Sequence, residues 1–342
     1  MLILFTIVAF SQTKLQSITL PINLKQINFG TFEKCLTIID VSLSSNTTYI
    51  DEKSFFETPK LTTINLTNII TIEEYAFKNS GLINTLRLTD INFIGKEAFK
   101  NNKVDKLLFG SNLNTLLNNA FENNNITNII FPKNIQTIGT DIFKGNNLNT
   151  ETSYIVVPKS IKNNASFGIT NVNNSFFIYD PSTYVFEQTQ TDIVVTNEIF
   201  AIVPANDLVF SGYSFYDLYN NGYSIANILS TTLTLEDAVN SIHLNSNIVV
   251  DLKNAGYSVN DLMNIGKLKQ NLITNLFVTN GYTLKEIENV FSLQTMFNNG
   301  ITLNNINDNV NDYPVSYILS NIANITLQSF YDASFDPYYL YP

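Results

Sequence analysis

The sequence contains few side chains that could carry out nucleophilic or metal chemistry. His243 is the single histidine and Cys35 the single cysteine among 342 residues. A Ser-His-Asp or Cys-His centre would therefore have to use His243, and the clusters of His and Cys that bind zinc cannot form. No glycine-rich phosphate-binding loop follows an expected strand. The sequence therefore predicts no catalytic, cofactor-binding or metal-binding residues, and no cofactor.

Two acidic patterns leave weaker alternatives open. Asp and Glu are scattered through the chain, and a carboxylate-dependent glycosidase needs only two of them, so this activity stays as a minor alternative. The stretch from Asn305 to Asp312 is rich in the oxygen ligands that calcium prefers. It lacks the glycine and the terminal glutamate of an EF-hand loop, so a solvated turn is the preferred interpretation. We therefore expect a protein that is not an enzyme.

Asparagine supplies the candidates for covalent modification. Six Asn-x-Ser/Thr sequences match the acceptor pattern for N-glycosylation, at Asn46, Asn65, Asn125, Asn164, Asn173 and Asn324. In so asparagine-rich a chain, chance alone gives roughly this number. Their placement in turns or at outward strand positions is therefore what supports the prediction that several carry a glycan.

The spacing of phenylalanine indicates how the chain is built. Six phenylalanines recur every 22 or 23 residues, each with an aliphatic residue five positions earlier. The six pairs are Ile27 and Phe32, Ile50 and Phe55, Ile72 and Phe77, Ile94 and Phe99, Leu116 and Phe121, and Ile138 and Phe143. A period in the low twenties predicts a solenoid, whose units bury their apolar faces by stacking on their neighbours. The rings are therefore expected in the core.

A short alternating segment precedes each of these pairs and predicts one strand per unit. The segments are 18–20, 41–43, 64–66, 86–88, 107–109 and 129–131. Alternation points the middle residue of each segment outward. Stacked strands would then form a parallel sheet with an exposed row that we expect to be the binding face, namely Thr19, Ser42, Asn65, Arg87, Leu108 and Ile130. The row is polar at one end and apolar at the other.

The repeat resembles a known family. Residues 126–143, with the order Ile-x-Phe-Pro, then Ile-Gly, then Ile-Phe, are similar to the BspA-type leucine-rich repeat, and the resemblance covers about residues 17 to 158. It implies surface or secreted proteins of bacteria and protists, often adhesive, without catalytic residues. Cys35 lies three residues after Phe32, where this family often has a cysteine packed inside the repeat. A buried thiol is therefore favoured over an intermolecular disulfide.

Composition limits the partners of the protein. The net charge is −10 and the pI about 4.6, and no basic run occurs. Nucleic acids and anionic membranes attract clustered Lys and Arg, so neither is an expected partner. With 44% apolar and 14% charged residues, the chain can bury a substantial core. Protein or glycan partners, and a second copy of the chain, remain as expectations.

The N-terminal residues predict secretion. An apolar stretch is followed by small residues at Ala9 and Ser11, so residues 1–11 are expected to be a signal peptide. The alternative is a first strand or a capping segment, because the stretch is short and lacks an early Lys or Arg. No other segment reaches the length that spans a bilayer, and no lipid-anchor signal follows. The expected location is secreted or extracellular surface, without membrane insertion.

The chain changes character after the repeats. The expected organisation is a leucine-rich-repeat domain (12–158), a β-rich cap or bridge (159–209), a short-helix repeat domain (210–306) and an aromatic C-terminal segment (307–342). Strands are expected in the bridge at 176–179, 184–186, 193–195 and 199–203. From Gly212, units of Gly-Tyr-Ser-x-x-Asp-Leu combine a helix stop, an N-cap and a capping box within ten residues. Such short helices must stack. The expected fold class is an α/β solenoid followed by an α-helical solenoid.

The last residues are unusually aromatic, and such side chains are not left in water. We expect them either to fold back as a cap or to dock on the next molecule and so form a filament. The proposed assembly residues are Phe330, Tyr331, Phe335, Tyr338, Tyr339 and Tyr341. Two functions follow from the sequence: an extracellular adhesion or binding module, and, as the alternative, a structural subunit of a glycosylated filament.

Overall fold

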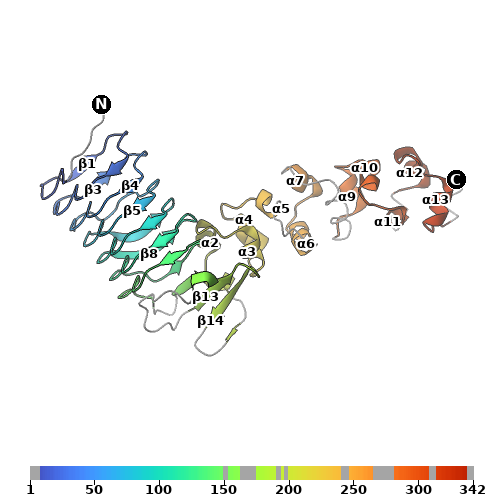
Figure 1. Cartoon of the computed structure of the whole chain (residues 1–342). Helices are drawn as coiled ribbons and strands as arrows, with labels where there is room; N and C mark the ends of the chain where they lie inside the picture. The colour runs from blue at the N-terminus through green and yellow to red at the C-terminus, as the bar shows by residue number, and fades with distance from the viewer. Residues whose placement is uncertain are drawn as a thin grey trace. The chain divides into compact units, whose positions relative to one another are not determined.

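A computed structural model describes residues 8–148, 153–161, 175–189, 194–195, 199–239, 246–264, 281–307 and 313–336. The chain divides into two compact units, Met1–Tyr223 and Ser224–Pro342. The first contains a parallel β-solenoid and the second a series of short helices (Figure 1). Both the solenoid and the helical repeats confirm the fold class expected from the sequence.

A column of stacked phenylalanine rings runs through the solenoid. All six predicted rings are at most 1% exposed, and neighbouring ring centroids lie 4.9–5.9 Å apart with nearly parallel planes. Phe10 extends the column by one ring and stacks on Phe32 at 5.3 Å. The backbone of residues 8–12 runs alongside the next turn and is bonded to it. The N–H groups of Val8, Phe10 and Gln12 donate to the carbonyls of Phe29, Thr31 and Glu33. Residues 8–12 thus cover the first predicted ring.

The longest sheet lies in the aliphatic part of the repeat. Its six parallel strands, of two residues each, contain the aliphatic partners of the rings. In spatial order they are β11 (Thr137–Ile138), β9 (Thr115–Leu116), β7 (Phe93–Ile94), β5 (Thr71–Ile72), β4 (Tyr49–Ile50) and β2 (Gln26–Ile27). These strands differ from the expected one strand per unit, which lies in the alternating segment before them. Two-residue strands leave no alternation to detect.

The predicted alternating strands form shorter sheets. β1 (Ser17–Thr19) pairs with β3 (Asp40–Ser42), and β6 (Ile83–Leu88) pairs with β8 (Lys103–Phe109). β10 (Ile129–Ile130) and β12 (Tyr154–Pro158) continue in parallel into β13 (Ser175–Asp180), while β14 (Val185–Thr189) and β15 (Val194–Val195) are antiparallel. The strand expected at 64–66 is not formed, although Leu66 is buried and Asn65 is exposed as its pattern requires.

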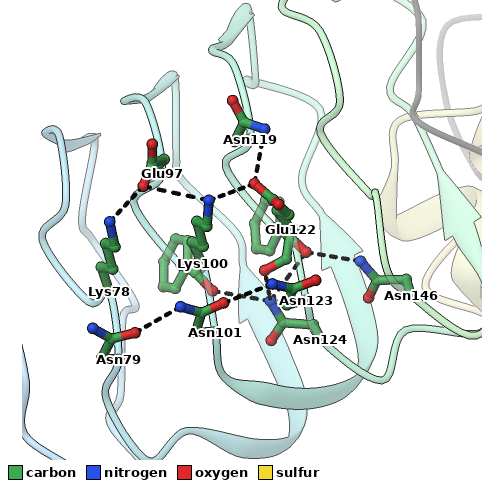
Figure 2. Close-up of polar contacts among 12 residues, drawn as sticks. Lys78, Asn79, Glu97, Lys100, Asn101, Asn119, Glu122, Asn123, Asn124 and Asn146 are labelled. Atoms are coloured by element: carbon green, nitrogen blue, oxygen red, sulfur yellow. Dashed lines mark hydrogen bonds and ion pairs between the residues drawn. The ribbon is translucent and has the colours of Figure 1, made fainter.

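The third residue after each phenylalanine of the column bonds to backbone groups with its side chain. Asn102 donates from Nδ2 to the carbonyls of Phe77 (2.8 Å) and Phe99 (2.9 Å), and its Oδ1 accepts the N–H of Leu82 at 3.1 Å. Asn124 and Asn146 repeat this arrangement one and two turns later (Figure 2). Earlier turns use smaller donors, since the same place is taken by Cys35, Thr58 and Ser80. We call this series the capping column.

Two polar rows at the surface run beside the capping column. Asn79, Asn101 and Asn123 form an amide chain with N···O distances of 2.8 and 2.9 Å. All three have left-handed backbones with φ between 56° and 59°, a conformation that Asn tolerates better than most residues. A parallel ion row joins Lys78, Glu97, Lys100 and Glu122 (Figure 2). The abundance of asparagine therefore has structural causes in this part of the chain.

Two helices replace an expected strand before the helical repeats. Residues 199–203 were predicted as a strand, but Ile199–Ile202 form α1, and α2 (Ala205–Phe210) follows. The run is apolar in every position, and such runs do not distinguish a strand from a buried helix. The strands expected at 176–179, 184–186 and 193–195 correspond to β13, β14 and β15.

The helical repeats have the predicted starts and stops. In the first unit, α3 (Phe215–Tyr219) follows α2. The second unit contains α4 (Ile225–Leu229), α5 (Leu235–Val239), α6 (Ser246–Asn254), α7 (Val259–Asn264), α9 (Leu284–Glu288), α10 (Leu293–Asn298), α11 (Leu303–Asn307), α12 (Val315–Asn321) and α13 (Leu327–Asp332). Ser214 and Thr283 complete capping boxes with Asp217 and Glu286. Glycines such as Gly222 and Gly281 have φ of 88° and 94°, which is left-handed backbone that favours glycine.

We predict that the capping column contributes more to stability than the exposed amide row. Asn102→Leu removes the acceptor of a buried N–H group and should lower the free energy of unfolding by about 2–3 kcal/mol. Asn101→Gly keeps the left-handed backbone at φ 59°. This variant should change the free energy of unfolding by less than about 0.5 kcal/mol. Urea unfolding measures both. Equal losses in the two variants would show that the capping column has no special role.

Candidate binding face and its partial cover

The predicted binding face is exposed over only part of its length. Thr19, Ser42, Asn65 and Arg87 are exposed as expected. Leu108 and Ile130 are only 4% and 3% exposed, so the expectation that these two are available on the surface was wrong. Strand pairing places Thr19 in register with Ser42, and Arg87 in register with Leu108. The apolar end of the row is buried within the same unit.

The first helices of the helical part are bonded to the covered end of this row. α2 contacts β8, and the guanidinium of Arg87 lies 5.7 Å from the ring centroid of Phe210. Just after α2, Ser211 Oγ donates to the carbonyl of Phe109 at 3.0 Å. Tyr213 OH donates to the carbonyl of Phe131, also at 3.0 Å. These two carbonyls belong to the residues that directly follow Leu108 and Ile130, so the helices are fixed to successive strands.

Two buried aspartates fasten the helices, and each is bonded to one lysine and one tyrosine. Asp207 of α2 receives Lys106 Nζ at 2.8 Å and Tyr154 OH at 3.1 Å. Ten residues later, Asp217 of α3 receives Lys133 Nζ at 2.7 Å and the hydroxyl of Tyr179. In each case an aspartate on a helix meets a lysine of the repeats and a tyrosine of the sheet that contains β12 and β13. We call them the first and second Asp-Lys-Tyr clusters.

Asp217 stays ionised although it is buried. Burial acts to raise the pKa of this carboxyl, but hydrogen bonds from Lys133, Tyr179 and Ser214 outweigh it and hold the pKa below its ordinary value. Burial and the neighbouring Asp217 carboxylate raise the pKa of Tyr179. The second Asp-Lys-Tyr cluster is therefore a charged pair with a neutral phenol, and it acts as a fastening between helix and solenoid.

Neither Asp-Lys-Tyr cluster is predictable from the local sequence pattern. The capping box already explains Asp217 locally, because its Oδ2 accepts the N–H of Ser214 at 2.6 Å. A distant lysine partner leaves no trace in that pattern. One signal was present, since an outward row that turns apolar at Leu108 and Ile130 requires a cover.

The uncovered end forms a polar surface, which we call the polar face. It combines the exposed row with the residues two positions before each member. It consists of Ser17, Thr19, Asp40, Ser42, Thr63, Asn65, Thr85 and Arg87. One aspartate and one arginine give it no net charge, and hydroxyl and amide groups make up the rest. Such a surface can exchange hydrogen bonds with a neutral polar ligand.

The predicted glycosylation residues differ in their surroundings. Asn46, Asn65, Asn125 and Asn324 are exposed, whereas Asn164 and Asn173 lie outside the described residues. Asn46 donates its Nδ2 to the carbonyl of Ile22 at 2.8 Å. Asn65 instead accepts on Oδ1 from both the N–H (3.0 Å) and the hydroxyl (2.7 Å) of Thr67. Because Asn65 belongs to the polar face, a glycan there and a ligand on that face would exclude each other.

The other residues that the sequence offered for chemistry are Cys35, His243 and the stretch from Asn305 to Asp312. Those that the structure describes are bonded to nearby residues. The thiol of Cys35 is buried and lies 3.1 Å from the carbonyl oxygen of Phe10. His243 lies outside the described residues. Of the oxygen-rich stretch, Asn305 accepts the N–H and hydroxyl of Thr302 and thus caps α11, while residues 308–312 are outside the described part. No group of three or more His, Cys, Asp or Glu that could hold a metal occurs among the described residues.

The predicted assembly residues divide between core and surface. Phe330 and Phe335 are at most 3% exposed and pack edge to face at 5.0 Å, whereas Tyr331 is 49% exposed. Tyr338, Tyr339 and Tyr341 lie outside the described residues. Within the described ranges, we find no helix with the length and apolar character needed to span a membrane.

Comparison with known proteins identifies the repeat. A family model described as the BspA type leucine rich repeat region matches in six copies, which together extend from residue 6 to residue 218. The chain belongs to the BspA-type leucine-rich repeat family. The phenylalanine column and the aliphatic sheet are thus the interior of BspA-type repeats. The family match also includes the two Asp-Lys-Tyr clusters. No curated protein matches the chain.

Three solved structures are similar to part of the chain. The pneumococcal vaccine antigen PcpA is 22% identical, with 42% of this chain and 31% of that chain covered and a TM-score of 0.29. A leucine-rich cell surface protein from Faecalibacterium prausnitzii is 16% identical (52% and 44% covered, TM-score 0.35). A leucine-rich repeat protein from Bacteroides ovatus is 15% identical (50% and 68% covered, TM-score 0.22). The matched part spans less than half of the first two proteins.

We predict that Asp217→Asn loosens α3 from the BspA-type repeats. Lys133, whose side chain is 25% exposed, would lose its partner, and the free energy of unfolding should fall by about 3 kcal/mol, the low end for a broken buried pair. The folded pKa is depressed, so the carboxylate stabilises the fold above the ordinary value of about 4 and ceases to do so as pH falls through the folded value. In urea unfolding, the difference between variant and parent should therefore be smaller at low pH than at neutral pH.

Asp261→Asn is the matched control for this prediction. Asp261 caps its helix through the N–H and hydroxyl of Ser258 at 2.8 and 2.6 Å, and it is exposed. Asp261 is the third residue of α7, after the N-cap Ser258. Asparagine keeps a side-chain oxygen that can accept both bonds, so a change of less than about 1 kcal/mol is expected. A loss as large as that of Asp217→Asn would assign the effect to capping rather than to Lys133.

Proposed function

We propose that this protein is a non-enzymatic, extracellular binding module of the BspA-type repeat family. The observation that supports this most directly is the difference between the two ends of one surface. The apolar end is covered by the chain's own helices, with Leu108 and Ile130 at most 4% exposed. The polar end, which carries Thr19, Ser42 and Asn65, stays exposed.

The chemistry of the polar face favours a neutral polar ligand. Its one aspartate and one arginine balance each other, and Ser42 Oγ lies 3.4 Å from Asp40 Oδ2. Hydroxyl and amide groups donate and accept hydrogen bonds equally well. We propose a glycan or a polar protein segment as the partner, and neither nucleic acid nor an anionic membrane, because the chain has a net charge of −10.

A binding function also agrees with the state of the buried carboxylates. The three buried aspartates among the described residues are Asp180, Asp207 and Asp217. Each is paired with a lysine, at Lys159, Lys106 and Lys133. A general acid needs a raised pKa and access to substrate, and these groups are instead held as ion pairs. This supports leaving the glycosidase alternative aside.

We predict that a bulky charge on the polar face abolishes ligand binding. The purified chain would be tested on a printed glycan array and on an array of extracellular matrix proteins. Ser42→Arg places a long cation in the centre of the face and should weaken binding at least about tenfold, a loss of ~1.4 kcal/mol. Thr137→Arg is the control, since Thr137 is exposed on the edge strand β11 of the six-stranded sheet.

The outcomes of that experiment separate the candidate functions. Loss of binding with Ser42→Arg but not with Thr137→Arg supports the polar face. Loss with Thr137→Arg alone would move the site to the other sheet. The filament alternative predicts instead that the chain elongates in light scattering without any added ligand.

Secretion is part of the proposal and has its own test. Cleavage after Ser11, the expected end of a signal peptide, would remove Phe10, which stacks on Phe32 at 5.3 Å. Secretion through this signal peptide therefore predicts protein in the culture medium with a mature N-terminus at Gln12 and with Phe32 as the outermost ring of the column. Intact mass spectrometry measures this directly. Protein that stays in the cells and retains Phe10 would instead support the alternative that residues 1–11 are a capping segment.

A further inference from the structure

The polar face carries the only arginine of the chain. The sequence has 19 basic residues, and all of them except Arg87 are lysines. The difference is chemical, because a guanidinium presents its N–H groups as a planar fork that matches the two oxygens of a carboxylate, whereas an ammonium acts as a point charge. Among hydroxyl and amide groups, the polar face therefore has one group that is suited to binding a carboxylate.

Arg87 is exposed and has no carboxylate partner in the part of the chain that the structure describes. The ion pairs between described residues are all made by lysines. On the next strand, for example, Lys106 is paired with Asp207 at 2.8 Å. No described residue accepts a hydrogen bond from the Arg87 guanidinium. Its N–H groups are thus available to a ligand.

The end of α2 holds this guanidinium in place. The charged group lies 5.7 Å from the ring centroid of Phe210, which is a cation–π distance. The helix is itself fixed, because Asp207 is bonded to Lys106 and to Tyr154. A side chain that is already held loses less conformational freedom when it binds. Arg87 is therefore preorganised for a ligand that lies on the polar face.

The preceding turn adds an amide donor beside Arg87. The two turns are bonded to each other, since the N–H of Ile83 donates to the carbonyl of Thr62 at 3.1 Å. Adjacent turns of this kind are about 4.8 Å apart. Asn65 uses its Oδ1 to accept two bonds from Thr67, and its Nδ2 has no partner among the described residues. A carboxylate on Arg87 can therefore also accept a bond from the Asn65 amide.

The rest of the polar face favours a sugar over a protein segment. The hydroxyls of Thr63 and Thr85 are exposed and have no described partner, and none of the eight residues of the face is apolar or aromatic. Protein interfaces depend on buried aromatic and aliphatic anchors, whereas sugar hydroxyls exchange hydrogen bonds with hydroxyl and amide groups. The net charge of −10 repels a polyanion. A single carboxylate on an otherwise neutral glycan meets all these conditions.

We propose that Arg87 is a carboxylate-binding subsite and that the ligand of the polar face is a glycan with one acidic sugar, a uronic or a sialic acid. The carboxylate accepts two N–H bonds from the Arg87 guanidinium and one from Asn65 Nδ2. Neutral sugars of the same glycan extend over the hydroxyl groups of the earlier turns. This inference rests on the proposed function and names the group that the ligand carries.

NMR of the isotope-labelled full chain tests the subsite directly. Because Arg87 is the only arginine, its guanidinium Nε–H gives a single signal that needs no assignment. The chain is produced without N-glycans, so that Asn65 stays unmodified. Glucuronate or N-acetylneuraminate should move the signal to saturation, whereas glucose, the neutral counterpart of glucuronate, should leave it in place. A signal that neither acid moves would overturn the proposal.

A glycan array with matched pairs, printed with and without their acidic sugar, tests the variants. Arg87→Lys keeps the charge but loses the fork, and it should weaken binding of the acidic glycans at least about tenfold, a loss of ~1.4 kcal/mol. Lys25→Gln is the control. It removes a full charge from an exposed residue directly before β2 and should leave binding unchanged. Urea unfolding of each variant, compared with the parent, checks that the fold is kept.

The outcomes distinguish this inference from the proposed function. If Ser42→Arg abolishes binding but the acidic and neutral glycans bind the parent equally, the polar face is a binding site and the subsite at Arg87 is wrong. If Ser42→Arg has no effect on any bound glycan, both proposals are wrong. If N-acetylglutamate amide moves the Arg87 signal as strongly as glucuronate, the occupant is an acidic protein segment, and the assignment to a glycan is overturned.

Discussion

The stacking of one backbone turn on the next is the constraint on which the repeat region depends. The N–H of Phe77 donates to the carbonyl of Ala98 at 2.7 Å, and that of Phe99 to Ala120 at 2.8 Å. The ring centroids of Phe77 and Phe99 are 5.2 Å apart, close to the spacing of neighbouring strands. One spacing therefore has to satisfy backbone hydrogen bonds and ring packing together. As a result, each position of the repeat becomes a continuous row along the stack, in the core and on the surface alike.

The sequence predicts those rows well where side-chain type follows burial. The Ile-x4-Phe spacing identifies the core, and the Ser or Thr caps and Gly stops identify the helices, because both signals are local. The capping column was missed because Cys35, Thr58, Ser80 and Asn102 have no side-chain class in common. Their shared role is geometric, since each donates to the carbonyl of a phenylalanine of the ring column. The helix at 199–202 was missed because its apolar run has no period that separates helix from strand.

The outward row of the repeats shows a different limit of prediction. An outward position is inferred from alternation alone, and alternation cannot reveal what another part of the chain places upon it. Arg87, Leu108 and Ile130 all occupy outward positions, yet two of them are buried. The pairing of Lys106 with Asp207 and of Lys133 with Asp217 joins residues 84 to 101 positions apart. Such distances lie beyond any local pattern, and they decide which half of the surface can meet a ligand.

The direction of the hydrogen bonds between turns also determines how the repeat region bears mechanical load. These bonds run along the stack, from one turn to the next, and each turn contacts mainly its neighbours. A pulling force applied between the ends of the stack would load the turns in series and peel them one at a time, instead of shearing many bonds at once. A solenoid built in this way yields gradually and absorbs work over a long extension, while the turns that have not yet peeled keep their side chains in place.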